Sequence, residues 1–191
     1  MKCISCTPCL WSKLLLLGVL GVLLVSYFGG CRLIGGESCP ISGTSRSDAP
    51  QIGSSVGDIA PDFELPTVEG PSLSSKTLQG KPTVLVFWTA WCPICKDEAP
   101  AINRLAAEFE PKGVKVIGIN IGESDARIAE GIKDFGIKYT VAKDRDTIVA
   151  RSFKVVGTPT IIILDRAGLV EYYGHEVPDD YATRLGRLIE G

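Results

Sequence analysis

A pair of cysteines with two residues between them stands between an apolar run and a helical pattern, and this arrangement constrains the fold most. The run, Thr83–Trp88, reads TVLVFW and is rich in β-branched and aromatic residues. That composition predicts a strand buried on both faces. After the pair, Cys92 and Cys95, apolar residues recur at helical spacing up to Phe109. The sequence therefore places two cysteines at a strand-to-helix junction.

Two more apolar runs predict further strands, at 114–120 and 160–164. A buried strand, a helix and a second buried strand imply a parallel pair joined by a crossover helix. Ser124 is expected to cap the next helix and Gly136 to end it. The elements that complete the prediction are helices at 125–135, 146–153 and 178–189 and an antiparallel strand at 168–174. The pattern predicts an α/β domain, one sheet with helices on both faces.

The position of the cysteine pair predicts its chemistry. Cys92 would stand at a helix N-terminus, where unpaired N–H groups and the helix dipole favour a thiolate. Cys95 lies one turn further in, within reach for a disulfide and more shielded. Pro93 suits the first helical turn because its missing N–H would have no partner there. The sequence thus predicts an exposed attacking sulfur and a buried resolving one.

Three other roles for the pair compete with redox chemistry: a zinc site, a structural disulfide and a copper site. A structural zinc site normally needs four ligands, and residues 57–191 hold only Cys92, Cys95 and His175 as cysteine or histidine. A purely structural disulfide would close too small a loop to constrain the unfolded chain much. The pair could also bind copper as soft ligands, which depends on whether His175 reaches it. A redox-active pair is the leading interpretation, and it needs neither a metal nor a cofactor.

Two motifs resemble those of thioredoxin-fold proteins. The segment 87–96, FWTAWCPICK, resembles their WCxxCK active site, and 157–160, GTPT, resembles their cis-proline loop. The resemblance implies that Cys92 and Cys95 are catalytic and form a disulfide. It also implies a kink at Pro100. The residues it assigns to substrate binding or active-site support are Trp91, Pro93, Ile94, Thr158 and Pro159.

The start of the domain narrows this resemblance. Residues 60–66, APDFELP, followed by 72–80, are similar to the N-terminal extension of the TlpA/ResA/DsbE-like branch of the redoxin (AhpC-TSA) superfamily. This implies a thioredoxin fold, with a central mixed β-sheet flanked by helices and an N-terminal β extension. It also implies an exported, membrane-anchored reductant of protein disulfides, supplied with electrons by a membrane thiol reductase. Several members serve cytochrome c maturation.

The sequence departs from thioredoxin near the pair. Val86 stands where thioredoxin has a buried Asp that manages the proton of the buried thiol, so water or another carboxylate must take that role. Glu64 and Glu69 are candidates, although each is also typical of a solvated loop charge. His175 is interpreted as a loop histidine in solvent. Trp91 is expected to shield the site and Trp88 to belong to the core.

An apolar segment without charge, 14–30, precedes the domain, and Lys2 and Lys13 precede that segment. Its length is at the lower limit for a helix that crosses a hydrocarbon core, so it is either a short transmembrane anchor or the apolar part of a signal peptide. The two lysines favour export of everything downstream. Either interpretation places the domain at a membrane, facing the periplasm or another extracytoplasmic space.

The domain boundaries follow from these segments. Residues 1–34 are expected to hold a cytoplasmic tail and the anchor or signal, and 35–56, rich in Gly, Ser and Pro, a flexible linker. The thioredoxin-like domain spans 57–191. Cys31 would either carry lipid or pair with Cys39. No role is assigned to the cysteines of the N-terminal tail, Cys3, Cys6 and Cys9.

Charge and the family resemblance leave one more alternative. The net charge is −2 and no basic stripe occurs, which argues against nucleic-acid binding. A thiol peroxidase is the alternative enzyme, because the APDFEL opening also occurs in peroxiredoxins and Thr89 lies three residues before Cys92. Those enzymes carry a proline where this chain has Leu85. Thiol–disulfide exchange therefore remains the leading function.

Overall fold

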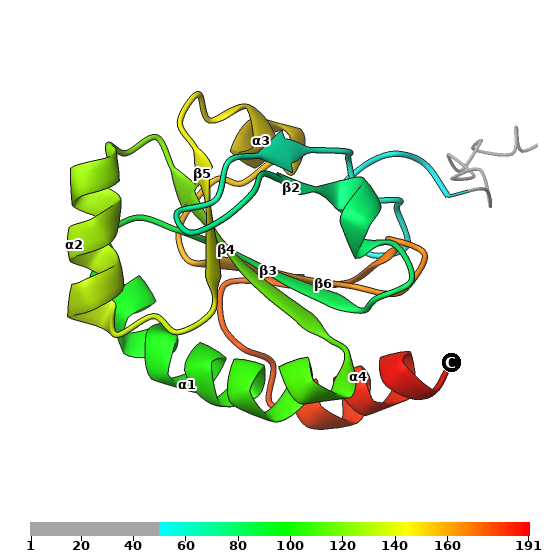
Figure 1. Cartoon of the computed structure of the whole chain (residues 1–191). Helices are drawn as coiled ribbons and strands as arrows, with labels where there is room; N and C mark the ends of the chain where they lie inside the picture. The colour runs from blue at the N-terminus through cyan, green and yellow to red at the C-terminus, as the bar shows by residue number, and fades with distance from the viewer. Residues whose placement is uncertain (1–49) are drawn as a thin grey trace, which may run out of the picture. The chain divides into compact units, whose positions relative to one another are not determined.

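The structure, a computed structural model, describes residues 50–191 (Figure 1). Five strands form one sheet in the order β5-β4-β3-β6-β7. Strands β3, β4 and β5 are parallel, and β6 and β7 continue the sheet in antiparallel pairing. The strands are β3 (Thr83–Trp88), β4 (Lys115–Ile121), β5 (Thr140–Asp144), β6 (Thr160–Leu164) and β7 (Val170–Gly174). The sheet is therefore mixed, as the thioredoxin resemblance implied.

Helices cover both faces of the sheet, with α1 and α4 along one side and α3 with the small strand β2 on the other (Figure 1). Alternate residues of β3 serve the two sides: Val84 and Val86 pack toward α1, and Leu85 and Phe87 pack toward α3. The helices are α1 (Pro93–Phe109), α2 (Asp125–Phe135), α3 (Ile148–Ser152) and α4 (Tyr181–Glu190), with 3-10 turns η1 (Ser75–Leu78) and η2 (Glu110–Lys112). Each face of the sheet thus has its own apolar core.

The expected N-terminal β extension is present as two short strands. β1 (Glu64–Leu65) pairs antiparallel with β2 (Leu73–Ser74). Leu65 and Phe63 enter the core on the α3 side of the sheet. There the Phe153 ring lies 6.1 Å from that of Phe63 and 5.5 Å from that of Phe87. Each such aromatic pair contributes about 1 kcal/mol beyond simple burial, so the extension is part of the folded domain.

Most predicted elements are found where the sequence placed them. The strand predicted at 114–120 begins and ends one residue later, and the helices predicted at 146–153 and 178–189 are shorter or shifted at their ends. Ser124 caps α2 by accepting a hydrogen bond from the Arg127 N–H, and Gly136 ends it in the left-handed conformation, φ 63°. Pro100 lies inside α1.

One strand of the main sheet was not predicted. β5 reads TVAKD, and only part of it is apolar. It lies at the edge of the sheet, where β4 is its one neighbour in the strand order. An edge strand needs less apolar sequence than a central one because it is covered less completely. The apolar pattern was therefore too weak to mark it.

The segments ahead of the domain are described only in part. Residues 50–56, the end of the expected linker, lie against the folded part of the chain, where the Gly53 N–H donates to the Ile59 carbonyl and Ser54 is buried. The anchor or signal segment and the rest of the linker lie outside the described residues. Within 50–191, none of the helices combines the length and the apolar character that a membrane span requires.

Candidate active site

The cysteine pair sits on a tight turn between β3 and α1. The Cys92 N–H donates to the Thr89 carbonyl at 3.2 Å and closes a four-residue turn. Cys92 is the N-cap of α1, with an extended backbone, and Pro93 occupies the first helical position. The end of a buried strand and the start of a helix thus fix the backbone of Cys92 from both sides.

Cys92 and Cys95 form a disulfide, with their Cα atoms 5.3 Å apart. The Cys95 N–H donates to Cys92 Sγ at 3.1 Å, so the sulfur satisfies an N–H group that the helix itself leaves unpaired. In the reduced protein this N–H and the dipole of α1 favour a thiolate on Cys92. The geometry therefore provides the electrostatic support that the sequence predicted for Cys92.

The predicted difference in exposure between the two cysteines is wrong. Cys92 and Cys95 are each only 4% exposed. A loop distant in sequence covers Cys92, because its Sγ lies 3.3 Å from the Thr158 carbonyl oxygen. A disulfide sulfur carries no proton, so this is a contact in the oxidised protein. A reduced Cys92 thiol could donate a hydrogen bond to the same oxygen.

The loop that covers Cys92 is the predicted cis-proline loop. The Thr158–Pro159 peptide bond is cis, as expected. Pro159 is buried and leads directly into β6. Lys154, four residues before Thr158, is held by Tyr173, whose hydroxyl donates a hydrogen bond to the Lys154 carbonyl at 3.1 Å. Burial raises the pKa of Tyr173, so the hydroxyl keeps the proton that it donates.

Three apolar side chains next in sequence to the cysteines or just before the cis-proline loop are exposed. Trp91 is 68% exposed, Ile94 60% and Val156 89%. Trp91 thus presents most of its ring to solvent instead of packing over the cysteines as expected. Trp88 belongs to the core, with its ring 5.6 Å from that of Phe135. Exposed apolar groups of this kind are typical of surfaces that contact a partner.

Neither predicted carboxylate is buried beside the pair. Glu64 and Glu69 are exposed, as expected for solvated charges, and Val86 is core. Two other carboxylates matter more, Glu98 on α1 and Glu123 in the loop between β4 and α2. Glu98 is half-buried one turn after Cys95, and its Oε2 accepts a hydrogen bond from the Val177 N–H at 3.4 Å. The other, Glu123, contacts the turn before Cys92 itself.

Glu123 was missed because no local pattern marks it. It follows β4, which runs parallel to β3, and the carboxyl ends of neighbouring parallel strands meet at one edge of a sheet. Its Oε2 accepts hydrogen bonds from the Ala90 N–H and from Asn120 Nδ2, both at 2.7 Å. The parallel pairing of β3 with β4 was the signal that could have pointed to Glu123.

His175 is exposed, as expected, but it is not free in solvent. Its Nδ1 lies 2.8 Å from the Pro159 carbonyl oxygen and 3.5 Å from Thr160 Oγ1. The carbonyl can only accept, so Nδ1 carries the proton in this contact. Within residues 50–191, no three His, Cys, Asp or Glu side chains are grouped so that they could hold a metal ion.

The comparisons with known proteins agree with this geometry. Residues 56–173 match the model of the AhpC/TSA family. The chain belongs to this family. A thiol-disulfide oxidoreductase ResA from Bacillus thuringiensis subsp. konkukian is 31% identical over 135 residues, which is 70% of this chain and 78% of that protein. This AhpC/TSA protein is therefore a protein-disulfide oxidoreductase of the ResA type.

Solved structures place the fold of this AhpC/TSA protein among thioredoxin-like proteins. A thiol:disulfide interchange protein from Chlorobium tepidum matches with a TM-score of 0.60 at 27% identity, over 69% of this chain and 95% of that one. A secreted Mycobacterium tuberculosis disulfide oxidoreductase, homologous to E. coli DsbE, matches with a TM-score of 0.55 at 25% identity, over 68% and 96%. The roles of individual site residues remain predictions.

Proposed function

We propose that this protein works outside the cytoplasm as a reductant of exported protein disulfides. The observation that carries the proposal is the N–H of Cys95 directed at Cys92 Sγ at the start of α1. A sulfur held in this way leaves and attacks as a thiolate, which is the reactive form in disulfide exchange. The relatives named as thiol-disulfide oxidoreductases support the same chemistry.

The proposed reaction exchanges one disulfide for another. The Cys92 thiolate attacks one sulfur of the substrate disulfide, which forms a mixed disulfide and releases the other substrate sulfur as a thiolate. Cys95, deprotonated, then attacks Cys92 Sγ, forms the Cys92–Cys95 disulfide and releases the second substrate thiolate. The two substrate thiolates take protons from water. The substrate gains two electrons and the enzyme loses them.

The surface near the pair favours an extended segment of a partner protein as substrate. Trp91, Ile94 and Val156 offer apolar contacts to side chains of such a segment. The backbone at Thr158 lies within 3.3 Å of Cys92 Sγ, so a chain that bound along this loop would bring its sulfur to the attacking atom. Main-chain contacts of this kind recognise a peptide without demanding one sequence.

The proposed location and partners rest on the sequence outside the domain. The apolar segment 14–30 with its preceding lysines supports export and attachment to a membrane. One similar structure is of a protein described as secreted. We propose that a membrane thiol reductase keeps Cys92 and Cys95 reduced, and that the substrates include the disulfide of an apocytochrome c, as the resemblance to ResA and DsbE proteins suggests.

A trapping experiment tests this proposal. In the Cys95→Ser variant the mixed disulfide on Cys92 cannot be resolved, so exported proteins with disulfides should accumulate on it and be released by dithiothreitol. The double variant Cys92→Ser/Cys95→Ser is the matched control and should trap nothing. Substrates that are only cytoplasmic proteins, or equal capture by both variants, would contradict the proposal.

A further inference from the structure

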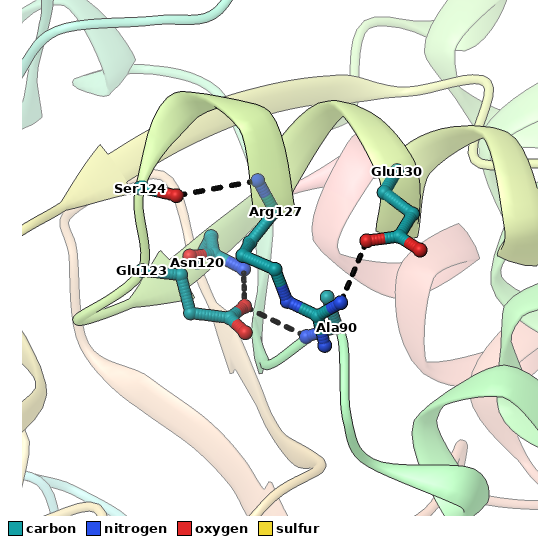
Figure 2. Close-up of polar contacts among 6 residues, drawn as sticks. All are labelled: Ala90, Asn120, Glu123, Ser124, Arg127 and Glu130. Carbon is teal, nitrogen blue, oxygen red and sulfur yellow. Dashed lines mark hydrogen bonds and ion pairs between the residues drawn. The ribbon is translucent and has the colours of Figure 1, made fainter.

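A carboxylate links the turn that carries Cys92 to the neighbouring strand. Glu123 Oε2 accepts the Ala90 N–H and the Asn120 Nδ2–H, each at 2.7 Å (Figure 2). Ala90 is the second residue of the turn that the Cys92 N–H closes on Thr89. Both hydrogen bonds are charge-assisted and short, and such bonds are about twice as strong as neutral ones.

The position of Glu123 before α2 does not explain this arrangement. Ser124 already caps the helix through the Arg127 N–H, and the Arg127 guanidinium pairs with Glu130 (Figure 2). The hydrogen bonds of the Glu123 carboxylate are made instead to the turn after β3 and to the end of β4. Its contacts are therefore those of a brace between the active-site turn and the end of β4, and not those of a helix cap.

Asn120 supports the same interpretation. It is 1% exposed and lies opposite Trp88 in the β3–β4 register. Burying an amide is costly unless it is hydrogen-bonded. Among residues 50–191 its Oδ1 has no hydrogen-bond partner. The hydrogen bond from Nδ2 to Glu123 is therefore what offsets the cost of burying this amide. An apolar residue would fill the position more cheaply if that bond had no purpose.

We infer that Glu123 is a positioning residue for the exchange reaction. By holding the Ala90 N–H, it fixes the turn of which Cys92 is the last residue. This turn places Cys92 Sγ next to the Cys95 N–H and the Thr158 carbonyl. The inference rests on the proposed thiol–disulfide exchange at Cys92. It adds Glu123 as the residue that holds the attacking sulfur in position.

The experiment follows the attack of Cys92 alone. It uses the full chain with Cys3, Cys6, Cys9, Cys31 and Cys39 replaced by Ser, fully reduced, and measures the second-order rate with 5,5′-dithiobis(2-nitrobenzoate) as the disulfide. The reduction potential of the pair and the melting temperature are measured on the same samples. If this parent protein does not react at all, the proposed exchange fails, whatever the variants of Glu123 do.

Three variants separate an effect on the position of Cys92 from an effect on the stability of the fold. Glu123→Ala should lower the rate about ten- to a hundredfold, the scale expected when a reacting atom is misplaced by roughly an ångström. Glu123→Gln should react within about threefold of the parent protein, because one amide oxygen can accept both hydrogen bonds that now end on a single carboxylate oxygen. Ser124→Ala, the control, should lower the melting temperature and leave the rate and the potential unchanged.

The outcomes are decisive in both directions. A slow Glu123→Ala with a normal Glu123→Gln supports the inference. The inference is overturned if Glu123→Ala reacts like the parent protein, or if Ser124→Ala slows the reaction equally. It is also overturned if Glu123→Gln is as slow as Glu123→Ala, since the charge and not the hydrogen bonds would then matter. If Glu123→Ala does not fold, Asn120→Ala removes one of the two anchors, and a normal rate in that variant counts against the brace.

Discussion

Two helices that follow neighbouring parallel strands begin in the same way but with different atoms. α1 follows β3 and is capped by the Cys92 sulfur, which accepts the N–H of Cys95 at 3.1 Å. α2 follows β4 and is capped by the Ser124 hydroxyl, which accepts the N–H of Arg127 at 3.4 Å. In both, the side chain of the N-cap satisfies the N–H three residues later. The reactive sulfur thus occupies an ordinary N-cap position. Its chemistry comes from the sulfur atom and not from an unusual backbone.

The two N-cap residues differ most in their surroundings. Ser124 is exposed, whereas Cys92 lies under the cis-proline loop and between apolar neighbours. Cys92 also has the Glu123 brace on the turn before it. The comparison indicates that burial and bracing, added to a common helix start, distinguish a reactive site from a structural one.

Replacing Cys92 with the serine found at the other N-cap should have the largest effect on activity. Cys92→Ser keeps an acceptor for the Cys95 N–H but removes the nucleophile, so reduction of insulin disulfides should fall at least about a thousandfold, as expected for loss of a nucleophile. The melting temperature should stay close to that of the reduced parent protein. Residual activity clearly above about a thousandth of the parent's would mean that Cys95 attacks directly.

Close packing of α2 on the active-site turn predicts the next largest effect. A Cβ on Gly131 would lie 2.7 Å from Ala90 Cβ and from Trp88 Cζ3. Gly131→Ala should therefore lower the free energy of unfolding by about 1–2 kcal/mol, because overpacking outweighs the gain in helix propensity. Urea unfolding measures this. Gly186→Ala, in α4 with open space at that position, is the matched control and should not destabilise the protein.

A cysteine placed at the other cap sharpens the comparison. In a background without the remaining cysteines, Ser124→Cys puts a thiol at the start of α2. Its pKa should fall below the ordinary value of about 8.5 by roughly half a unit, since the helix dipole favours the thiolate. The pH dependence of alkylation by iodoacetamide reports it. A pKa at or above the ordinary value would show that a helix start alone does not activate a thiol here.

The smallest effect is expected at the exposed start of α2. The slight loss of hydration at the helix start would raise the pKa of Asp125, but the charges of Arg145 and Lys143 outweigh it and hold the pKa below its ordinary value of 3.8. A lowered pKa means that the charged form stabilises the fold above about pH 4, and that this contribution is lost as the pH falls through the folded-state pKa. Asp125→Asn should thus destabilise slightly at pH 7 and not at pH 2, as measured by thermal unfolding.

The sequence predicted those parts of the molecule that local chemistry decides. Ser124 and Gly136 mark the ends of α2 because capping and left-handed backbone depend on a few adjacent residues. Exposure of Cys92 was predicted wrongly because the carbonyl that covers it belongs to a residue 66 positions away. Glu123 acts on a turn 33 positions earlier, through a strand pairing that no single segment reveals. Long-range contacts therefore supply what local patterns lack.

The reduction potential of the Cys92–Cys95 pair tests the central claim most directly. The chain without its other cysteines is equilibrated with glutathione or dithiothreitol buffers, and the fraction of disulfide is measured by alkylation and mass. A reductant of exported disulfides should have a potential near or below about −250 mV, in the range of thioredoxin. A value near about −120 mV, in the range of the oxidant DsbA, would contradict the account and make the protein a disulfide donor.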